Sequence, residues 1–286
     1  MQENQTEIST GTLFEWLYPF MFFVCAGWVV WHMPNYILDF IPPASESLVD
    51  QMSQLAIRKD VTAGLPGLFG GFTDFIDWAA LLALPVLGTL GTLGIKCAPM
   101  EYQEWRSFDR LAIFIGRVAM LMIISMTMVM LYEVFLRYVV EAPTLWANEL
   151  TLWIGGFVFL CSGFYAMQQR CHIRIFILYE IMPRWAQKCC DVISVALLVV
   201  FSFFLVYGSY KQVFIVKFYK WEMFGTAFDP PIPATIQPMI LIIIPLVALQ
   251  SVLNLIADWN KEPVSHSADS IDETEIEALK KSVESR

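Results

Sequence analysis

The sequence predicts an all-α, polytopic membrane protein with about six transmembrane helices, and two observations support that class. Of the 286 residues, 57% are hydrophobic and 16% are charged, whereas about a quarter of the residues in a soluble domain carry a charge. A membrane-spanning helix needs about 20 apolar residues, and six stretches of this chain are apolar and long enough to be candidates. The rest of the chain supplies loops and tails, which leaves no room for a soluble catalytic domain.

The N-terminal extension, residues 1–100, contains two of these stretches. The first, at about 14–41, has three tryptophans spaced as in an aromatic belt. A glutamate, two prolines and a histidine shorten its apolar core, so it either spans the membrane or lies tilted in the interface, and we favour a span. The second stretch, at about 75–95, is rich in small residues that let a neighbouring helix approach closely, namely Gly88, Thr89, Gly91, Thr92 and Gly94.

Residues 101–260 form a core with four expected spans, at about 111–133, 150–167, 192–210 and 234–256. The last residues, 261–286, are polar and acidic, and we favour a solvated cytoplasmic tail over a docking helix. Basic residues gather on the cytoplasmic side of a membrane protein, which favours an orientation with both termini in the cytoplasm. That orientation puts eight basic residues inside, namely Lys96, Arg106, Arg110, Arg170, Arg174, Arg184, Lys188 and Lys261, and five outside, namely Arg58, Lys59, Arg137, Lys217 and Lys220.

A few polar residues fall within or near the spans, where an ionisable group is costly and usually faces protein or water. We expect Arg117 to snorkel to the cytoplasmic surface rather than to pair with another helix. Asp77 and Asp191 lie close to span ends and are expected in the interface. Gln250 and Asn254 share one face of the last span and are expected to bond another helix. The six cysteines include no C-x-x-C pair, and we expect them to be small buried hydrophobic residues.

The composition excludes several classes of function. With 18 basic against 27 acidic residues, the net charge is −9, so a nucleic-acid partner is not expected. The sequence has no Ser, His and acid trio and no cluster of histidines and carboxylates at metal-ligand spacing, so we expect no catalytic residue, cofactor or metal. It also has neither repeated halves nor the broken helices of a secondary transporter. These features indicate a non-enzymatic partner subunit.

Most of the informative polar residues lie between the first and second of these core spans. Glu133 and Arg137 are four residues apart, in the favourable order for an ion pair on a helix. Pro143 then restarts the chain, Thr144 is a candidate cap for the next helix, and Glu149 comes early enough to meet its positive end. The span that follows has a face of small residues and ends in R-x-H-I-R, which contains Arg170, His172 and Arg174.

This ordered set, E-x-x-x-R-Y, then P-x-x-W-x-x-E-L, a small-residue span and R-x-H-I-R, resembles the small membrane subunit of tripartite ATP-independent periplasmic (TRAP) transporters, the DctQ-like Q subunit. The resemblance covers roughly residues 105–259. Its ending, from Pro230-Pro231-Ile232-Pro233 to Asp258-Trp259, is similar to the subtype associated with keto acids and other organic acids.

The resemblance implies a small permease subunit, a scaffold in the bacterial inner membrane with four spanning helices. Its implied partners are a large membrane subunit (M), whose elevator domain binds substrate and sodium for symport, and a periplasmic solute-binding protein (P). Residues 1–100 have no counterpart in that pattern. They would widen the contact with lipid or with M, or contact the periplasmic protein through the loop at 42–71.

The resemblance also implies roles for individual residues, as subunit-interface or structural positions. Glu133, Arg137, Trp146 and Glu149 would form a polar girdle at the periplasmic ends of two helices, and local architecture is favoured over contact with solute. A second set would begin the cytoplasmic connecting segment, whose pattern over 170–188 suggests an interfacial helix; this set is Arg170, His172 and Arg174.

Two other classes remain open from the sequence. One is the membrane-anchor subunit of a redox enzyme, with His32 or His172 as a cofactor ligand. The other is a stand-alone channel. A visible absorption spectrum would reveal haem in the first, and conductance of the chain reconstituted alone would reveal the second.

Overall fold

The computed structural model describes residues 13–39, 73–96, 98, 101, 106–170, 182–218 and 221–260, and every regular element in these ranges is a helix. This confirms the predicted fold class. The elements are α1 (Leu13–Trp31), α2 (Met33–Asp39), α4 (Phe75–Gly94), α5 (Asp109–Phe135) with its π-helical continuation η1 (Leu136–Val140), α6 (Trp146–Gln168), α8 (Arg184–Tyr210) with its π-helical continuation η2 (Lys211–Phe218), and α9 (Ile232–Asp258).

Within the described ranges, five helical stretches are long and apolar enough to cross a membrane, and they coincide with five of the predicted spans. The first predicted span differs, because helix α1 ends at Trp31 and a turn at His32 separates it from α2. Pro34 accounts for the break, because it has no N–H to donate to the carbonyl of Val30, four residues before it, and its ring clashes with that carbonyl. Helix α1 has 19 residues, which corresponds to about 28 Å, slightly less than a hydrocarbon core of roughly 30 Å.

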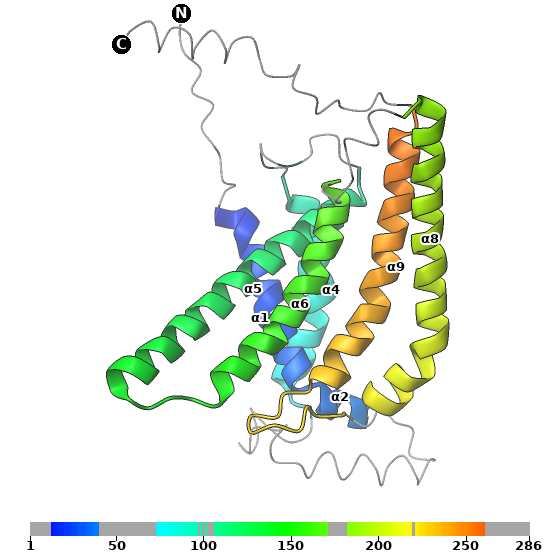
Figure 1. Cartoon of the computed structure of the whole chain (residues 1–286). Helices are drawn as coiled ribbons and strands as arrows, with labels where there is room; N and C mark the ends of the chain where they lie inside the picture. The colour runs from blue at the N-terminus through cyan, green and yellow to red at the C-terminus, as the bar shows by residue number, and fades with distance from the viewer. Residues whose placement is uncertain are drawn as a thin grey trace, which may run out of the picture.

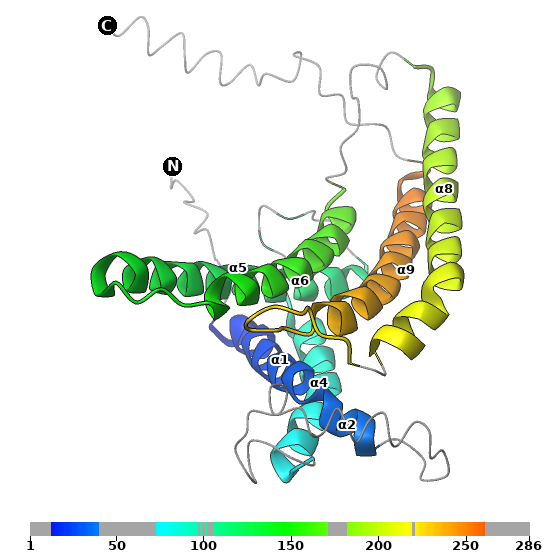
Figure 2. The same ribbon diagram turned by 60° about the horizontal axis from the view of Figure 1, so that its bottom comes forward.

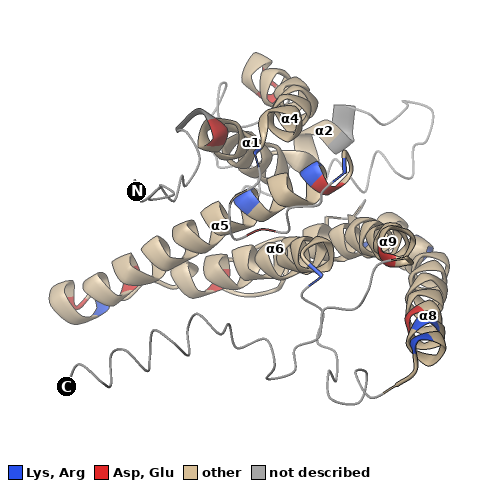
Figure 3. Ribbon diagram, turned by 90° about the horizontal axis from the view of Figure 1, so that it is seen from above, with Lys and Arg blue, Asp and Glu red and all other residues tan. Residues whose placement is uncertain are grey.

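The helices pack as a row in the order α4, α1, α5, α6, α9 and α8. Seen from above, α1 and α4 lie on one side of α5, and α6 and α9 lie on the other (Figure 3). Helices α5 and α6 form a hairpin whose tip points away from the pair formed by α8 and α9 (Figure 1). Figure 2 shows α1 and α4 side by side, with α2 at the end of α1. The N-terminal extension is therefore packed against the core through α5.

A close contact between α4 and α5 joins the extension to the core. A Cβ atom added at Gly91 would lie 2.3 Å from Cε2 of Phe114, so only glycine allows this approach. The ring of Phe114 is 1% exposed and stands edge-on to Phe22 of α1, with 5.3 Å between the ring centroids. The predicted small-residue packing is thus confirmed at Gly91, whereas a Cβ at Gly94 would meet open space.

Arg117 provides a polar link in the same region, and the prediction that it snorkels to the surface is wrong. Its Nη2 lies 3.0 Å from Oε1 of Glu101, and its guanidinium lies 5.3 Å from the centre of the Trp16 ring. The hydroxyl of Tyr165 donates to the same Glu101 oxygen at 3.1 Å. Because Glu101 is buried, a cation held between helices stabilises it more than one that reaches water. Arg117 thus connects α1 and α6 through α5.

Asp77 is buried, with 3% of its surface exposed, so the prediction of an interfacial position is wrong for this residue. Its Oδ1 accepts a hydrogen bond from Nε1 of Trp28 at 2.7 Å, and its Oδ2 accepts the backbone N–H of Asp74 at 3.1 Å in a capping box. The hydroxyl of Tyr36 donates to its backbone carbonyl at 2.6 Å. These donors, with the positive end of α4, offset the loss of hydration. Asp191 is half-buried in α8.

The cysteines agree only partly with the prediction that they are buried. Cys161 is buried and Cys25 is half-buried, but Cys189 and Cys190 are exposed. Both exposed residues lie in α8, which packs on α9 at the edge of the row, so much of its surface faces outward. Cys97 and Cys171 lie outside the described residues, as do the loop 42–71, the central part of the connecting segment (171–181) and the tail 261–286.

Replacing Gly91 with alanine is expected to lower the stability of the protein in detergent by about 1–3 kcal/mol, because the new methyl group overpacks the site of Phe114. The measurement is the free energy or midpoint of unfolding of the purified chain. The control is Gly94→Ala in the last turn of the same helix, where the Cβ meets nothing and helix propensity favours alanine by about 1 kcal/mol or less. Equal stability of the two variants would contradict the packing role of Gly91.

Candidate functional site

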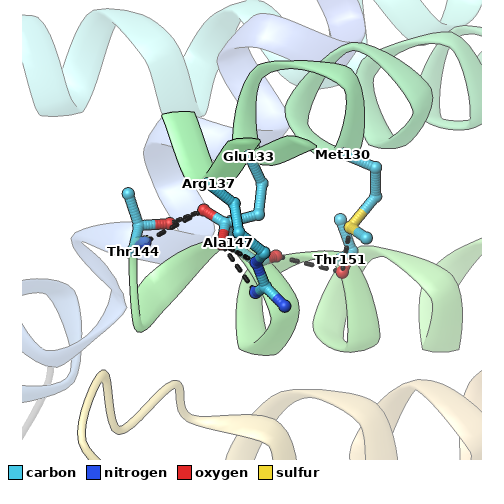
Figure 4. Close-up of polar contacts among 6 residues, drawn as sticks. All are labelled: Met130, Glu133, Arg137, Thr144, Ala147 and Thr151. Carbon is cyan, nitrogen blue, oxygen red and sulfur yellow. Dashed lines mark hydrogen bonds and ion pairs between the residues drawn. The ribbon is translucent and has the colours of Figure 1, made fainter. Parts of the chain in front are cut away.

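The predicted ion pair at the end of α5 is present, and its carboxylate is buried. Nε and Nη2 of Arg137 donate to Oε1 of Glu133 at 3.2 and 2.7 Å. The other carboxylate oxygen accepts the backbone N–H of Thr144 at 3.1 Å, and the Thr144 hydroxyl donates to it as well (Figure 4). The Glu133 side chain is 2% exposed and that of Arg137 is 43% exposed. Glu133 therefore ties the end of α5 to the segment that leads into α6.

Thr144 does not cap α6, contrary to the prediction. The helix begins at Trp146, after Leu145, and no side chain makes a capping hydrogen bond there. Both donors of Thr144 reach back to α5 instead. A buried carboxylate needs several donors, and this requirement decides which way the threonine points. The turn between the helices also has Glu141 at φ 58°, in the left-handed region that closes the end of η1.

Glu149 lies in the first turn of α6, as predicted, but its partners come from the segment before α9. Its Oε2 accepts the hydroxyl of Thr226 at 2.6 Å and the backbone N–H groups of Phe228 and Asp229, each at 3.2 Å. The carboxylate thus holds that loop against the start of α6. Trp146 lies nearby, with its ring 6.3 Å from that of Tyr132 on α5.

Helices α6 and α9 are also joined directly along their length. Nε1 of Trp153 donates to the hydroxyl of Thr235 at 2.8 Å. A Cβ added at Gly156 would lie 2.9 Å from Cδ1 of Ile236, so this glycine lets α9 approach closely. The small-residue face predicted for this span therefore packs on α9 at Gly156.

At the opposite end of the core, Arg170 binds Asp258 of α9. Its Nε and Nη2 donate to the two carboxylate oxygens at 2.5 and 3.1 Å. Arg170 has φ 56°, which ends α6 and turns the side chain toward α9. His172 and Arg174, the other predicted residues of this segment, lie outside the described residues.

Gln250 and Asn254 bond other helices, which confirms the prediction for both. Nε2 of Gln250 donates to Oδ1 of Asp109 on α5 at 2.7 Å. Nδ2 of Asn254 donates to the carbonyl of Met167 on α6 at 2.7 Å. Two amides on one face of α9 thus bind α5 and α6 at the same end of the bundle.

The predicted residues form contacts at both ends of the core rather than one converging site. Glu133 with Arg137, and Glu149 with its loop, lie at one end, and Arg170 lies at the other. Sequence reasoning missed the partners of these groups, Thr226 and Asp258 among them. Pairs that are 77 and 88 residues apart in the chain have no local spacing that reveals them. The polar groups hold neighbouring helices together through hydrogen bonds and ion pairs.

Replacing Glu133 with glutamine is expected to lower the melting temperature of the purified chain by a few degrees. The neutral amide loses the charge that holds Arg137, and its NH₂ group cannot accept the bonds that the carboxylate oxygen accepts. The matched control is Glu141→Gln, eight residues further along, where the side chain is exposed. Faster hydrogen exchange over 141–145 in the Glu133 variant alone would show that the stability is lost at the α5–α6 turn. Equal melting temperatures of the two variants would contradict the role of Glu133.

Comparison with known proteins agrees with the motif set in the core. Residues 126–260 match the family model described as "Tripartite ATP-independent periplasmic transporters, DctQ component". No curated protein and no solved structure matches the chain. The matched region begins within α5 and runs past the end of α9, so it contains the tip of the α5–α6 hairpin and the contacts of Glu133, Glu149 and Arg170. Residues 126–260 are therefore similar to the DctQ component of TRAP transporters, and this similarity indicates a small permease subunit.

Proposed function

We propose that this chain is the scaffold subunit of a TRAP transporter in the bacterial inner membrane. In this role it supports a large elevator-type M subunit during sodium-coupled uptake of an organic acid that a periplasmic binding protein delivers. The observation that carries the proposal is the DctQ match over the same helices that the polar contacts fasten together. The choice of an organic acid rests on the likeness of residues 230–259 to the organic-acid subtype.

The partners of the charged side chains support a scaffold role. At one end, Glu133 and Glu149 bind donors of this chain, and at the other end Arg170 binds Asp258. Groups occupied in this way hold helices in fixed positions, which a frame for a moving partner requires. We assign Glu133, Arg137, Trp146 and Glu149 to the stiffening of the periplasmic ends of the helices. The start of the cytoplasmic connecting segment is assigned to Arg170, His172 and Arg174.

The N-terminal extension fits this role as an addition on one side. Helices α1 and α4 cover the side of α5 that faces away from α6 and α9 (Figure 3). A large partner would then contact the remaining surfaces of the row, where the long helix α8 is largely exposed. Its exposed side chains include Leu197, Val200, Phe201, Phe204 and Tyr207.

The redox-anchor alternative gains no support from the family match. His32, one of the two histidines that made it a possibility, is 5% exposed and stacks on Trp28, with ring centroids 4.4 Å apart. Its Nδ1 is 3.0 Å from the carbonyl of Trp28. These contacts are those of a packed core histidine. The other histidine, His172, lies outside the described residues. The stand-alone channel likewise gains nothing from a family whose members are transporter components.

The described charges support the proposed orientation. In Figure 1, α1 starts and α9 ends at the top of the bundle. Basic residues at that end outnumber those at the other, as expected of a cytoplasmic side. The top end has Lys96, Arg106, Arg110, Arg117, Arg170, Arg184 and Lys188, and the bottom end has Arg137, Lys211 and Lys217.

A green fluorescent protein fused after Arg286 is therefore expected to fluoresce in cells, because this reporter folds on the cytoplasmic side of the bacterial inner membrane. Alkaline phosphatase fused at the same point is expected to be inactive, since it folds outside. The reverse pattern, a dark fluorescent protein and an active phosphatase, would overturn the orientation.

The scaffold assignment predicts that the tagged chain co-purifies with a large multi-span membrane subunit when the two are co-expressed. Replacing Glu149 with glutamine is expected to lower both the yield of the complex and solute uptake, because the 226–229 loop loses the acceptor that holds it. Solute binding by the periplasmic protein should not change.

The matched control is Glu141→Gln, an exposed carboxylate in the α5–α6 turn, which is expected to leave yield and uptake as in the wild type. Failure of the wild-type chain to retain a large membrane partner would refute the scaffold function. Normal yield and uptake in the Glu149 variant would refute only the role of that residue.

A further inference from the structure

A groove of about 780 Å³ lies between α5, α6 and the start of α9. Its lining comes from residues 126–130 of α5, residues 148–156 of α6, Phe224 and the first residues of α9. All three helices are candidate membrane spans, so the bilayer surrounds the groove. Lipid-facing grooves do not stay empty, because hydrocarbon chains or protein side chains fill them.

The walls of the groove are apolar, and its hydroxyl groups are already used. Met126, Met130, Leu152 and Ile236 are among the residues that line the groove. The Thr151 hydroxyl lies 3.0 Å from the carbonyl of Ala147 on its own helix. Thr127 likewise bonds the carbonyl four residues before it, at 2.8 Å. Such a surface suits a hydrocarbon chain, and the exposed amide of Asn148, near the start of α6, is the remaining polar side chain in the lining.

A positive charge lies beyond the end of the groove nearest the helix termini, because Arg137 follows the lining residue Met130 by two turns. Met130, Glu133 and Arg137 lie on one face of α5 and its continuation, and Figure 4 shows them above Ala147 and Thr151 of α6. Because Glu133 is buried and the Arg137 side chain is 43% exposed, the outward charge of the pair is positive. Nε and Nη2 of Arg137 bind Glu133, which leaves Nη1 for a further acceptor.

We propose that this groove binds one phospholipid, with an acyl chain along α6 between Met126 and Ile236 and its phosphodiester on Arg137. Apolar walls, with the Arg137 cation beyond their interface end, complement a molecule that has a hydrocarbon chain and an anionic phosphate. Arginine binds phosphate well, through N–H donors arranged in a fork.

The dimensions favour a lipid over a partner helix. The volume lies within the range of about 300–1,000 Å³ that is typical of small-molecule sites. A spanning helix about 10 Å wide packs along most of a neighbouring helix, whereas this groove ends after about three turns of α6. The inference requires only that α5, α6 and α9 lie in a bilayer, so it is independent of the transporter's substrate and of its other subunits.

Gly155 offers a substitution that fills the groove. A Cβ there would lie 3.8 Å from Sδ of Met126, an ordinary contact, so Gly155→Leu places its side chain in the groove without a clash at the backbone. The matched control is Gly163→Leu, two turns further along α6, where the Cβ meets nothing. Leu152→Trp is a second groove-filling change.

The experiment reconstitutes the full chain in vesicles of phosphatidylethanolamine and phosphatidylglycerol in equal amounts, extracts it in mild detergent and counts retained lipids by native mass spectrometry. The wild type and Gly163→Leu are expected to keep one phospholipid at collision energies in the mass spectrometer that remove the other bound lipids. Gly155→Leu and Leu152→Trp are expected to lose it, while circular dichroism and gel filtration remain unchanged.

Retention of the phospholipid by both groove-filling variants, or its absence from the wild type, would overturn the proposal. So would a result in which Gly155→Leu abolishes co-purification with a large membrane subunit while the wild type retains no lipid, because the groove would then hold a protein partner.

Discussion

Polar groups near lipid have to find their partners inside the protein, since hydrocarbon offers them none, and this requirement determines how the helices of the chain are joined. Glu133 illustrates it most clearly, because one buried carboxylate receives donors from Arg137 on its own helix and from Thr144 across the turn. Arg170 with Asp258, and Gln250 with Asp109, join further pairs of helices. The apolar faces make the chain a membrane protein, and these few contacts decide how its spans are arranged.

The same requirement explains how the helical N-terminal extension is attached to the core, part of which matches the DctQ family. Arg117 lies on α5 before the region that matches the DctQ family, and it contacts Glu101 and Trp16 of the preceding sequence. Gly91 and Phe114 add a close apolar contact beside it. An ion pair and a close apolar contact therefore both involve α5, which makes this helix the joint between the N-terminal extension and the core. A rigid joint is consistent with the proposed scaffold.

The accuracy of the sequence predictions depended on the distance between partners along the chain. Glu133 and Arg137 are four residues apart, so helical geometry alone predicted the pair. Thr144 and Arg117 were assigned to local roles, as a cap and as a snorkelling cation, and both proved wrong because partners from other helices were stronger. Asp77 was expected in the interface for a similar reason, since Trp28, which binds it, is 49 residues away.

By itself, the sequence determined the all-helical membrane class, five of the spans and the motif set typical of the DctQ component, because hydropathy and short spacings are local properties. Only the tertiary structure decided that α1 and α4 pack on α5, that Glu149 holds the loop before α9, and that α5, α6 and α9 enclose a groove. These features depend on which apolar faces meet, and apolar residues that face lipid and apolar residues that face protein have the same composition. The few polar side chains distinguish the two surfaces, and they do so only after folding has brought their distant partners together.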